Sequence, residues 1–274
     1  MKINRINPDC ATVQNGLPLY LQGKNDKAVL LIHGYNGYVH DVSFLANKLN
    51  KAGFTVSVPR NTGCGTDHTD FLSTKSRDWI RHAVDCYLDL KAVYKDVYLV
   101  GLSMGALISI ILASHFKVKK LVLAAPAVIL ISPVLPFTSF LRIFIKKIKR
   151  NTKFKPLNPV NNRTFAKEWK FLNSEYWSWH YVPALYQLQK IRRQAIKAVK
   201  KVKSDTLVLA SKSDLTVSLK TVIYLRDKCS AEKFESRIFE KSSHVITDSV
   251  EREDVAKAVI DWLIDKPARR DRQK

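Results

Sequence analysis

The stretch Val97–Ile110 reads VYLVGLSMGALISI and places Ser103 between two glycines, with an apolar run before it and a helix-like run after it. This Gly-x-Ser-x-Gly pattern is typical of a sharp turn from a strand into a helix, which leaves the serine hydroxyl exposed at its tip. Glycine is needed on both sides because a Cβ would crowd so tight a turn. The helix that follows directs backbone N–H groups at a place where negative charge can develop. We therefore predict that Ser103 is a nucleophile.

A serine hydroxyl is a poor nucleophile at neutral pH, so it needs a base, and the base needs an orienting carboxylate. Asp214 follows directly after the apolar run that ends at Ala210, although such an aspartate can also cap the next helix. Asp205 and Asp227 are weaker candidates, because one begins a strand and the other lies within a helix-like run. The only histidine that follows Asp214 is His244, in a polar loop after the last expected strand. We predict a triad of Ser103, Asp214 and His244.

The negative oxygen that forms on a substrate carbonyl needs two backbone donors. One is the N–H of the residue after the nucleophile, Met104, and the other comes from the loop after an early strand. His33 and Gly34 occupy that loop, so we predict the N–H of Tyr35 as the second donor, with His33 bracing the loop. The alternative is that His33 and Gly34 form an ordinary turn.

Apolar runs of strand length alternate with helical periodicities along most of the chain. Such alternation implies βαβ units and a mainly parallel sheet with helices on both faces. The expected strands are 27–32, 54–59, 97–100, 120–125, 205–210 and 234–239, and the expected helices include 42–51, 76–94 and 250–263. The alternation breaks between them, so we predict a core of residues 1–126 and 204–274 and a helical cap insertion of residues 127–203.

These motifs resemble the α/β-hydrolase superfamily, in the branch of small bacterial carboxylesterases and monoacylglycerol lipases. The matching stretches are Leu31–Tyr35, Gly101–Gly105, Ser213–Asp214 and Ser243–Thr247. The resemblance implies the α/β-hydrolase fold and hydrolysis of short- to medium-chain esters, monoacylglycerols or lysolipid-type substrates through an acyl-enzyme, with no metal or cofactor. Acyl transfer or thioester hydrolysis on the same triad and a non-catalytic ligand-binding role are the alternatives. The chain departs from the family's frequent Gly-His-Gly at Arg60–Gly65.

The formal net charge of +22 favours anionic partners, although a lysine-rich surface can also serve solubility alone. Much of the excess lies in the insertion, where Glu168 and Glu175 alone oppose the Lys and Arg residues between 142 and 203. We expect no nucleic-acid binding, because no recognisable module accompanies the charge. The remaining hypothesis is contact between the basic cap and an anionic membrane.

The insertion carries two apolar stripes at helical spacing and a group of aromatic residues. Each stripe either packs onto the main domain or faces a membrane, and the aromatic group is either a core for the cap or a wall for an acyl chain. The first stripe is Phe137, Phe140, Leu141, Phe144, Ile145 and Ile148; the second is Leu185, Leu188, Ile191, Ala195, Val199 and Val202; the aromatic group is Trp169, Phe171, Tyr176, Trp177, Trp179 and Tyr181.

The 274 residues suffice for one α/β domain with an insertion. Four scattered cysteines indicate neither a zinc site nor a disulfide framework. The sequence shows no secretory signal and no uncharged apolar run of about 18 residues, so we expect a cytoplasmic protein without a spanning helix. Nothing in the pattern indicates an oligomeric state.

Overall fold

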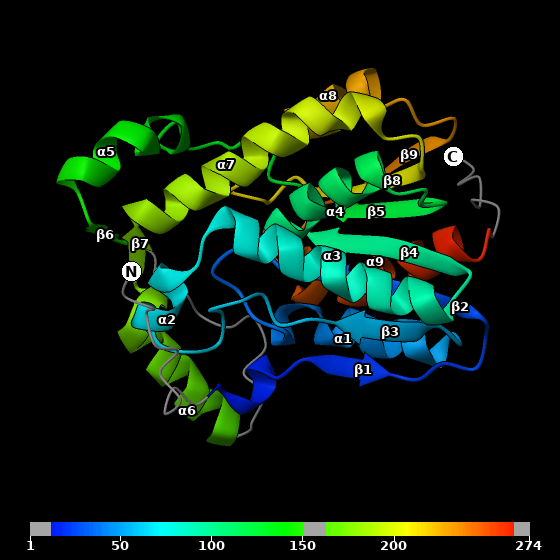
Figure 1. Ribbon diagram of the computed structural model, residues 1–274, viewed down its shortest axis with the longest axis horizontal. Helices are drawn as coiled ribbons and strands as arrows, with labels where there is room; N and C mark the ends of the chain where they lie inside the picture. The colour runs from blue at the N-terminus through cyan, green and yellow to red at the C-terminus, as the bar shows by residue number, and fades with distance from the viewer. Residues whose placement is uncertain (1–11, 151–162, 266–274) are drawn as a thin grey trace.

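The computed structural model describes residues 12–150 and 163–265, and it is built on a seven-stranded sheet in the order β1-β3-β2-β4-β5-β8-β9 (Figure 1). β1 pairs antiparallel with β3, and the other neighbours pair parallel. The strands are β1 Leu19–Leu21, β2 Lys27–Ile32, β3 Thr55–Val58, β4 Asp96–Leu102, β5 Lys120–Ala124, β8 Asp205–Ser211 and β9 Phe234–Phe239. The predicted fold class, an α/β sheet that is mainly parallel, is therefore confirmed.

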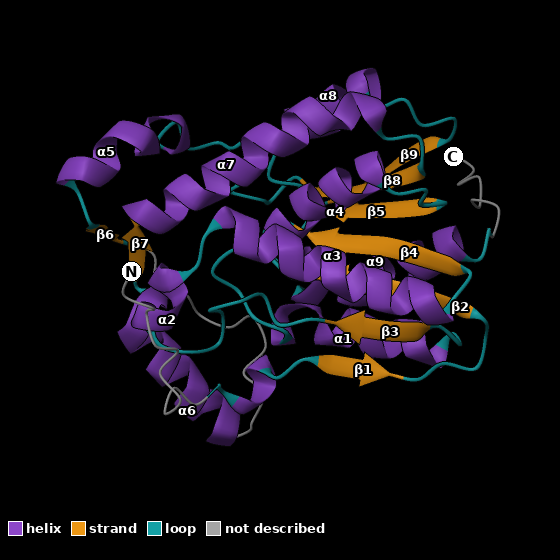
Figure 2. Cartoon of the chain, viewed as in Figure 1, coloured by secondary structure: helices purple, strands orange, loops and turns teal. Residues whose placement is uncertain are grey.

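Helices cover both faces of this sheet (Figure 2). α3 and α4 lie on one face, and α1 and α9 pack together on the other. The helices around the sheet are α1 His40–Lys51, α2 His68–Ser73, α3 Ser76–Val93, α4 Met104–His115, α8 Lys220–Lys228 and α9 Arg252–Leu263. No helix in the described ranges is long and apolar enough to cross a membrane.

From Ala28 to Ile32, the β2 strand is apolar at every position because both of its faces are buried. Ala28, Leu30 and Ile32 belong to the hydrophobic cluster beneath α3 and α4. Val29 and Leu31 belong to the separate cluster beneath α1 and α9. Successive side chains of a strand point to opposite faces, so a strand covered on both sides needs an apolar residue at every position.

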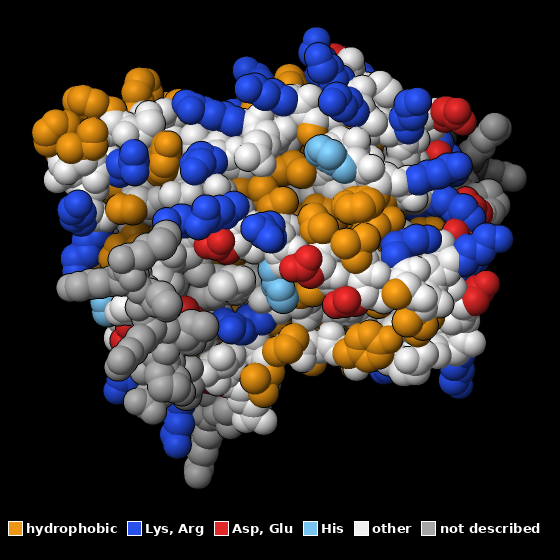
Figure 3. Space-filling view, viewed as in Figure 1, with side chains coloured by type: hydrophobic (Ala, Val, Ile, Leu, Met, Phe, Trp, Pro, Cys, Tyr) orange, Lys and Arg blue, Asp and Glu red, His pale blue; other side chains and the backbone are white. Residues whose placement is uncertain are grey.

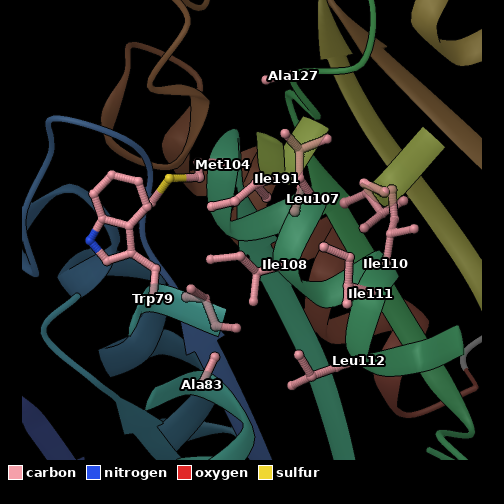
Figure 4. Close-up of a cluster of buried hydrophobic side chains, with 14 of the residues drawn as sticks. Trp79, Ala83, Met104, Leu107, Ile108, Ile110, Ile111, Leu112, Ala127 and Ile191 are labelled. Carbon is pink, nitrogen blue, oxygen red and sulfur yellow. The ribbon is translucent and has the colours of Figure 1, made fainter. Parts of the chain in front are cut away.

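The α4 helix is apolar all round because it is enclosed. Residues Met104 to Ala113 are all buried. α4 lies between the sheet and two other helices, with Trp79 and Ala83 of α3 and Ile191 of α7 in the same cluster (Figure 4). A helix buried on every side has no need of a polar face, which explains how the residues after Ser103 form a helix without amphipathic periodicity.

The segment between β5 and β8 leaves the sheet at the carboxyl ends of the strands, and the elements described before α7 lie beside that edge (Figure 1). Its longest helix, α7, returns along α4 and packs against it. The elements of the segment are α5 Thr138–Phe144, β6 Lys147–Lys149, α6 Arg163–Leu172, a short π-helix Asn173–Trp177, β7 Trp179–Tyr181 and α7 Val182–Ala198.

The two apolar stripes differ in the elements that carry them and in the surfaces that they face. Those members of the second stripe that lie on α7 face the core, with Ile191 and Ala195 almost fully buried. The helical spacing of the first stripe predicts one helix that continues through residue 148. This prediction is wrong, because α5 ends at Phe144 and Ile148 lies on β6. β6 pairs with β7, and this tertiary pairing overrides the helical spacing.

Two members of the aromatic group, Tyr176 and Trp177, pack against residues outside the insertion. The ring of Tyr176 stacks on Phe71 at 4.8 Å, and its hydroxyl accepts a hydrogen bond from the N–H of Gly65 at 2.8 Å. Trp177 packs edge-on against Tyr38 at 5.3 Å. These rings therefore join the inserted segment to the loops that follow β2 and β3.

Gly105 in α4 lies too close to β2 for a side chain to fit. A Cβ there would lie 2.0 Å from the carbonyl oxygen of Ile32 on β2, and neither backbone can retreat within a packed core. We expect Gly105→Ala to lower the free energy of unfolding by about 2 kcal/mol or more, as overpacking does. Urea denaturation measures this effect. Ala113→Gly, at a buried position of the same helix, is the control, for which a loss of about 1 kcal/mol is expected. A Gly105→Ala protein as stable as the parent would contradict the close approach.

Candidate active site

The turn at Ser103 is strained and tightly enclosed. Ser103 has φ 54° and ψ −108°, a conformation that residues with a Cβ seldom adopt. It stands between the end of β4 and the start of α4, and its N–H donates to the carbonyl of Ala124 at 2.8 Å. A Cβ on Gly101 would lie 2.4 Å from the backbone of Gly105. Both glycines of the motif are therefore required by close backbone approach, and the serine hydroxyl is left at the carboxyl edge of the sheet.

The three side chains predicted as a triad lie in one hydrogen-bonded chain. Nε2 of His244 lies 2.9 Å from Oγ of Ser103, and Nδ1 of His244 lies 2.8 Å from Oδ2 of Asp214. Asp214 follows β8 and His244 follows β9, so all three positions stand where parallel strands end. Loops at the carboxyl ends of a parallel sheet converge in this way. Ser103 and His244 remain partly exposed, and Asp214 is buried.

Asp214 is held as a carboxylate. Burial alone would raise its pKa, but hydrogen bonds and the charge of His244, together with the amides of Val217 and Thr216, outweigh burial and lower it. Those amides donate to Oδ1 at 3.0 and 2.7 Å, which leaves Oδ2 for the imidazole. Since a carboxylate only accepts, Nδ1 of His244 carries a proton toward it, and Nε2 of the neutral ring is free to accept from Ser103.

Glu251 is a residue of this region that the sequence analysis did not identify. Its carboxylate accepts hydrogen bonds from the backbone N–H groups of Ser242 at 2.7 Å, Lys241 at 2.9 Å and Glu240 at 3.2 Å. These amides begin the loop that carries His244. Glu251 therefore fixes the loop from the residue just before α9, and no short motif in the sequence signals such a contact.

His33 fixes the orientation of one peptide beside Ser103. Burial lowers its pKa to about 4, so the ring is neutral. Its Nε2 accepts the N–H of Asn61 at 3.0 Å, which places the ring proton on Nδ1, 3.0 Å from the carbonyl oxygen of Gly34. Because a trans peptide directs its C=O and N–H to opposite sides, this contact turns the N–H of Tyr35 away from His33.

The backbone of the His33 loop, and not its tyrosine ring, borders the serine. A Cβ on Gly34 would lie 3.3 Å from Cβ of Ser103. The ring of Tyr35 is directed into packing, 5.6 Å from Phe71 and 6.2 Å from Trp79. Met104 is the first residue of α4, where a helical N–H has no partner within its own helix. The sequence predicts the N–H groups of Tyr35 and Met104 as the two oxyanion donors. Met104 directly follows Ser103, and Tyr35 directly follows Gly34 in the loop that borders Ser103.

Asp41 lies behind this loop and is a second carboxyl of the region, in a half-buried residue. Its Oδ2 accepts the N–H of Tyr38 at 3.2 Å, and its carbonyl accepts the hydroxyl of Thr247 at 2.6 Å. Burial raises the pKa of Asp41 to about 7, with the charge of Asp248 adding to the effect. Asp41 therefore connects the loop before α1 with the loop that carries His244.

Several known hydrolases are similar to this chain. The family model for serine aminopeptidase, S33, matches residues 23–251. A carboxylesterase of Bacillus subtilis (strain 168) is 26% identical over 240 residues, covering 87% of this chain and 92% of that protein. A thermostable monoacylglycerol lipase of Bacillus sp. (strain H-257) is 39% identical over 87 residues, 32% of this chain and 35% of that protein. A structure from work on the metagenome-derived lipolytic enzymes LipS and LipT superposes with a TM-score of 0.80 at 23% identity, covering 93% of this chain and all of that one.

The raised pKa of Asp41 predicts a pH-dependent stability. The folded protein holds this proton up to about pH 7, whereas the unfolded chain releases it near pH 4, so the contribution of Asp41 becomes unfavourable as pH rises between these values. We expect Asp41→Asn, which keeps an acceptor for Tyr38, to gain stability relative to the parent from pH 4 to 7 and to level off above. Urea unfolding at several pH values measures the difference. Asp85→Asn, at an exposed position of α3, is the control; a difference for Asp41→Asn that does not vary with pH would contradict the burial effect.

Proposed function

Since the chain belongs to the serine aminopeptidase S33 family, and is a serine hydrolase enzyme of the α/β-hydrolase fold, we propose that it cleaves carboxylic esters through an acyl-enzyme. The proposed substrates are short- or medium-chain acyl esters and monoacylglycerol- or lysolipid-type molecules. The observation that carries the proposal is the chain of hydrogen bonds from Ser103 through His244 to Asp214. A carboxylesterase and a monoacylglycerol lipase among the relatives support this choice of substrate class.

In the proposed reaction, Nε2 of His244 takes the proton of Ser103 while Oγ attacks the ester carbonyl carbon. The resulting oxyanion is stabilised by the N–H groups of Tyr35 and Met104. His244 then gives its proton to the leaving alcohol oxygen as the C–O bond breaks, and the acyl group remains on Ser103. Water repeats the sequence with His244 as base, which releases the carboxylic acid. Asp214 keeps the imidazole oriented and stabilises its charged form throughout.

Residues 127–203 serve as a cap over Ser103 in this proposal. Within the described part of that range, the inserted segment lies off the carboxyl edge of the sheet (Figure 1), the edge at which β4 ends just before Ser103. Tyr176 and Trp177 fix the segment to the loops that follow β3 and β2. An insertion so placed limits access of water and shapes the space for an acyl chain. The cap's basic character favours contact with an anionic membrane, which is where a lipid ester is presented.

An ester fits the charges of this cap better than a peptide with a free amino terminus. Recognition of a substrate ammonium group calls for carboxylates near the nucleophile. The cap has only two between residues 142 and 203, and both are engaged elsewhere: Glu168 accepts from Asn15, and Glu175 lies 2.7 Å from His68. Transfer of the acyl group to an acceptor other than water would use the same three side chains, and identification of the products separates the two reactions.

Replacement of the nucleophile tests the proposal directly. We expect Ser103→Ala to lower kcat/KM on p-nitrophenyl esters of graded chain length by roughly 10⁴- to 10⁶-fold, because no other group forms the acyl-enzyme. Ser114→Ala, near the far end of α4, is the matched control and keeps its rate. A fluorophosphonate probe labels the parent on Ser103 and fails to label the variant. Full turnover by Ser103→Ala would show that the assignment is wrong.

The role of His33 is tested by two substitutions that each keep one of its contacts. An asparagine amide lies near the position of Nδ1 and can still donate to Gly34, whereas a glutamine amide lies near Nε2 and cannot. We expect His33→Asn to keep kcat within about tenfold and His33→Gln to lose about 10²-fold with little change in KM, as loss of one oxyanion donor does. Thermal midpoints of both variants are measured as the control for folding. Equal losses in the two would exclude the orienting role.

A further inference from the structure

The exposed side of the inserted segment carries a row of large apolar side chains that the catalytic proposal does not use. Ile131, Val134, Phe137, Phe140 and Ile143 recur at every third position, and Phe144 lies beside the last of them. We call these six residues and Leu215 the apolar row. Their exposed fractions are 54%, 38%, 63%, 63%, 62% and 70% in that order, and 86% for Leu215. Figure 3 shows hydrophobic side chains gathered at the end of the molecule that α5 occupies in Figure 1.

The apolar row begins next to the proposed catalytic machinery. Leu215 directly follows Asp214 in the chain. The next residue, Thr216, accepts the N–H of Ile131 through its carbonyl at 2.9 Å, and Leu130 bridges to Val217. Leu215 and Ile131 therefore lie in neighbouring segments of the chain at the carboxyl edge of the sheet. From this place the row continues along the segment to the end of α5, so the apolar surface begins at the loop that carries Asp214.

Around α5 and α7, the charged residues beside the apolar row are cations. Residues 127–150 and 176–204 contain no Asp or Glu. Arg142 of α5 and Lys190 of α7 lie over the ring of Tyr186, at 4.2 and 5.6 Å, and Lys147 lies 4.3 Å from the ring of Trp179. Lys146 and Lys149 are exposed close by in the chain. Aromatic rings beneath lysine and arginine side chains keep these charges at the surface beside the exposed phenylalanines.

We infer that the apolar row is a membrane-docking surface, and that its partner is an anionic lipid bilayer. Apolar side chains enter the headgroup region of a bilayer, while flanking Lys and Arg residues bind its negative surface potential. A second copy of this chain fits less well, because it would bring two rows of cations together. The inference rests on the proposed function for its purpose: docking by this side brings the loop that carries Asp214, and with it the proposed triad, close to the lipids that would carry its ester substrate.

Vesicle sedimentation tests the docking surface without any turnover, in the Ser103→Ala background. We expect binding to vesicles of phosphatidylcholine with phosphatidylglycerol and little binding to phosphatidylcholine alone. Phe140→Ser with Phe144→Ser should lower the partition coefficient about tenfold or more, since two exposed rings are lost. Lys146→Gln with Lys149→Gln should lower it several-fold, and high salt should remove that difference. Val93→Ser with Ile223→Ser, at exposed apolar positions on α3 and α8, is the matched control and should bind as the parent does.

Three results would overturn the inference: no binding to anionic vesicles, equal binding to neutral and anionic vesicles, or unchanged binding by the Phe140→Ser, Phe144→Ser protein. A parent that sediments as a dimer in solution and becomes a monomer with these two substitutions, without vesicle binding, would assign the row to a second copy instead. Hydrolysis of a soluble short-chain ester by the parent is measured separately. Failure of that assay would contradict the proposed function and leave the vesicle result standing on its own.

Discussion

The structure depends on the close contact between the start of α4 and the end of β2. The carbonyl of Ile32 lies so near Gly105 that no side chain fits between them. This contact determines where α4 leaves the sheet, and the strained φ of 54° at Ser103 is the consequence. Backbone strain of this kind persists only where the surroundings over-determine it. Here the enclosure of α4 between the sheet, α3 and α7 supplies that constraint.

The parts of the fold that follow from local chemistry were predictable from the sequence. The apolar run of β2 and the glycines around Ser103 report burial on both faces and close backbone approach, which are encoded residue by residue. Asp214 and His244 could be found because the carboxyl ends of parallel strands meet at one edge. Glu251 could not, since its contacts join a helix terminus to a loop through backbone amides that any sequence possesses. The cap boundaries at residues 127 and 203 and the roles of the predicted site residues remain predictions.

In the inserted segment, helical periodicity does not predict which apolar side chains are buried. Both stripes have helical spacing and consist of apolar residues, yet Ile191 is buried against α4 while Phe140 is exposed. The difference arises from tertiary position: α7 lies along α4, whereas α5 is short and is followed by a strand that pairs with β7. An amphipathic pattern reports that one side of a helix is apolar, but not whether protein or another apolar phase covers that side.

Hydrogen bonds through Asp41 join the loop that carries His244 to the loop that follows β2. The hydroxyl of Thr247, three residues after His244, donates to the carbonyl of Asp41 at the start of α1. Asp41 in turn holds the N–H of Tyr38, in the loop that begins with His33 and Gly34. The loop that carries the imidazole and the loop that orients the Tyr35 peptide are therefore fixed to each other as well as to the sheet. Catalysis of acyl transfer requires a base and oxyanion donors that hold their positions before the substrate arrives. In the proposed reaction this cross-connection would hold those groups in place without any contact to Ser103, through residues remote from the serine.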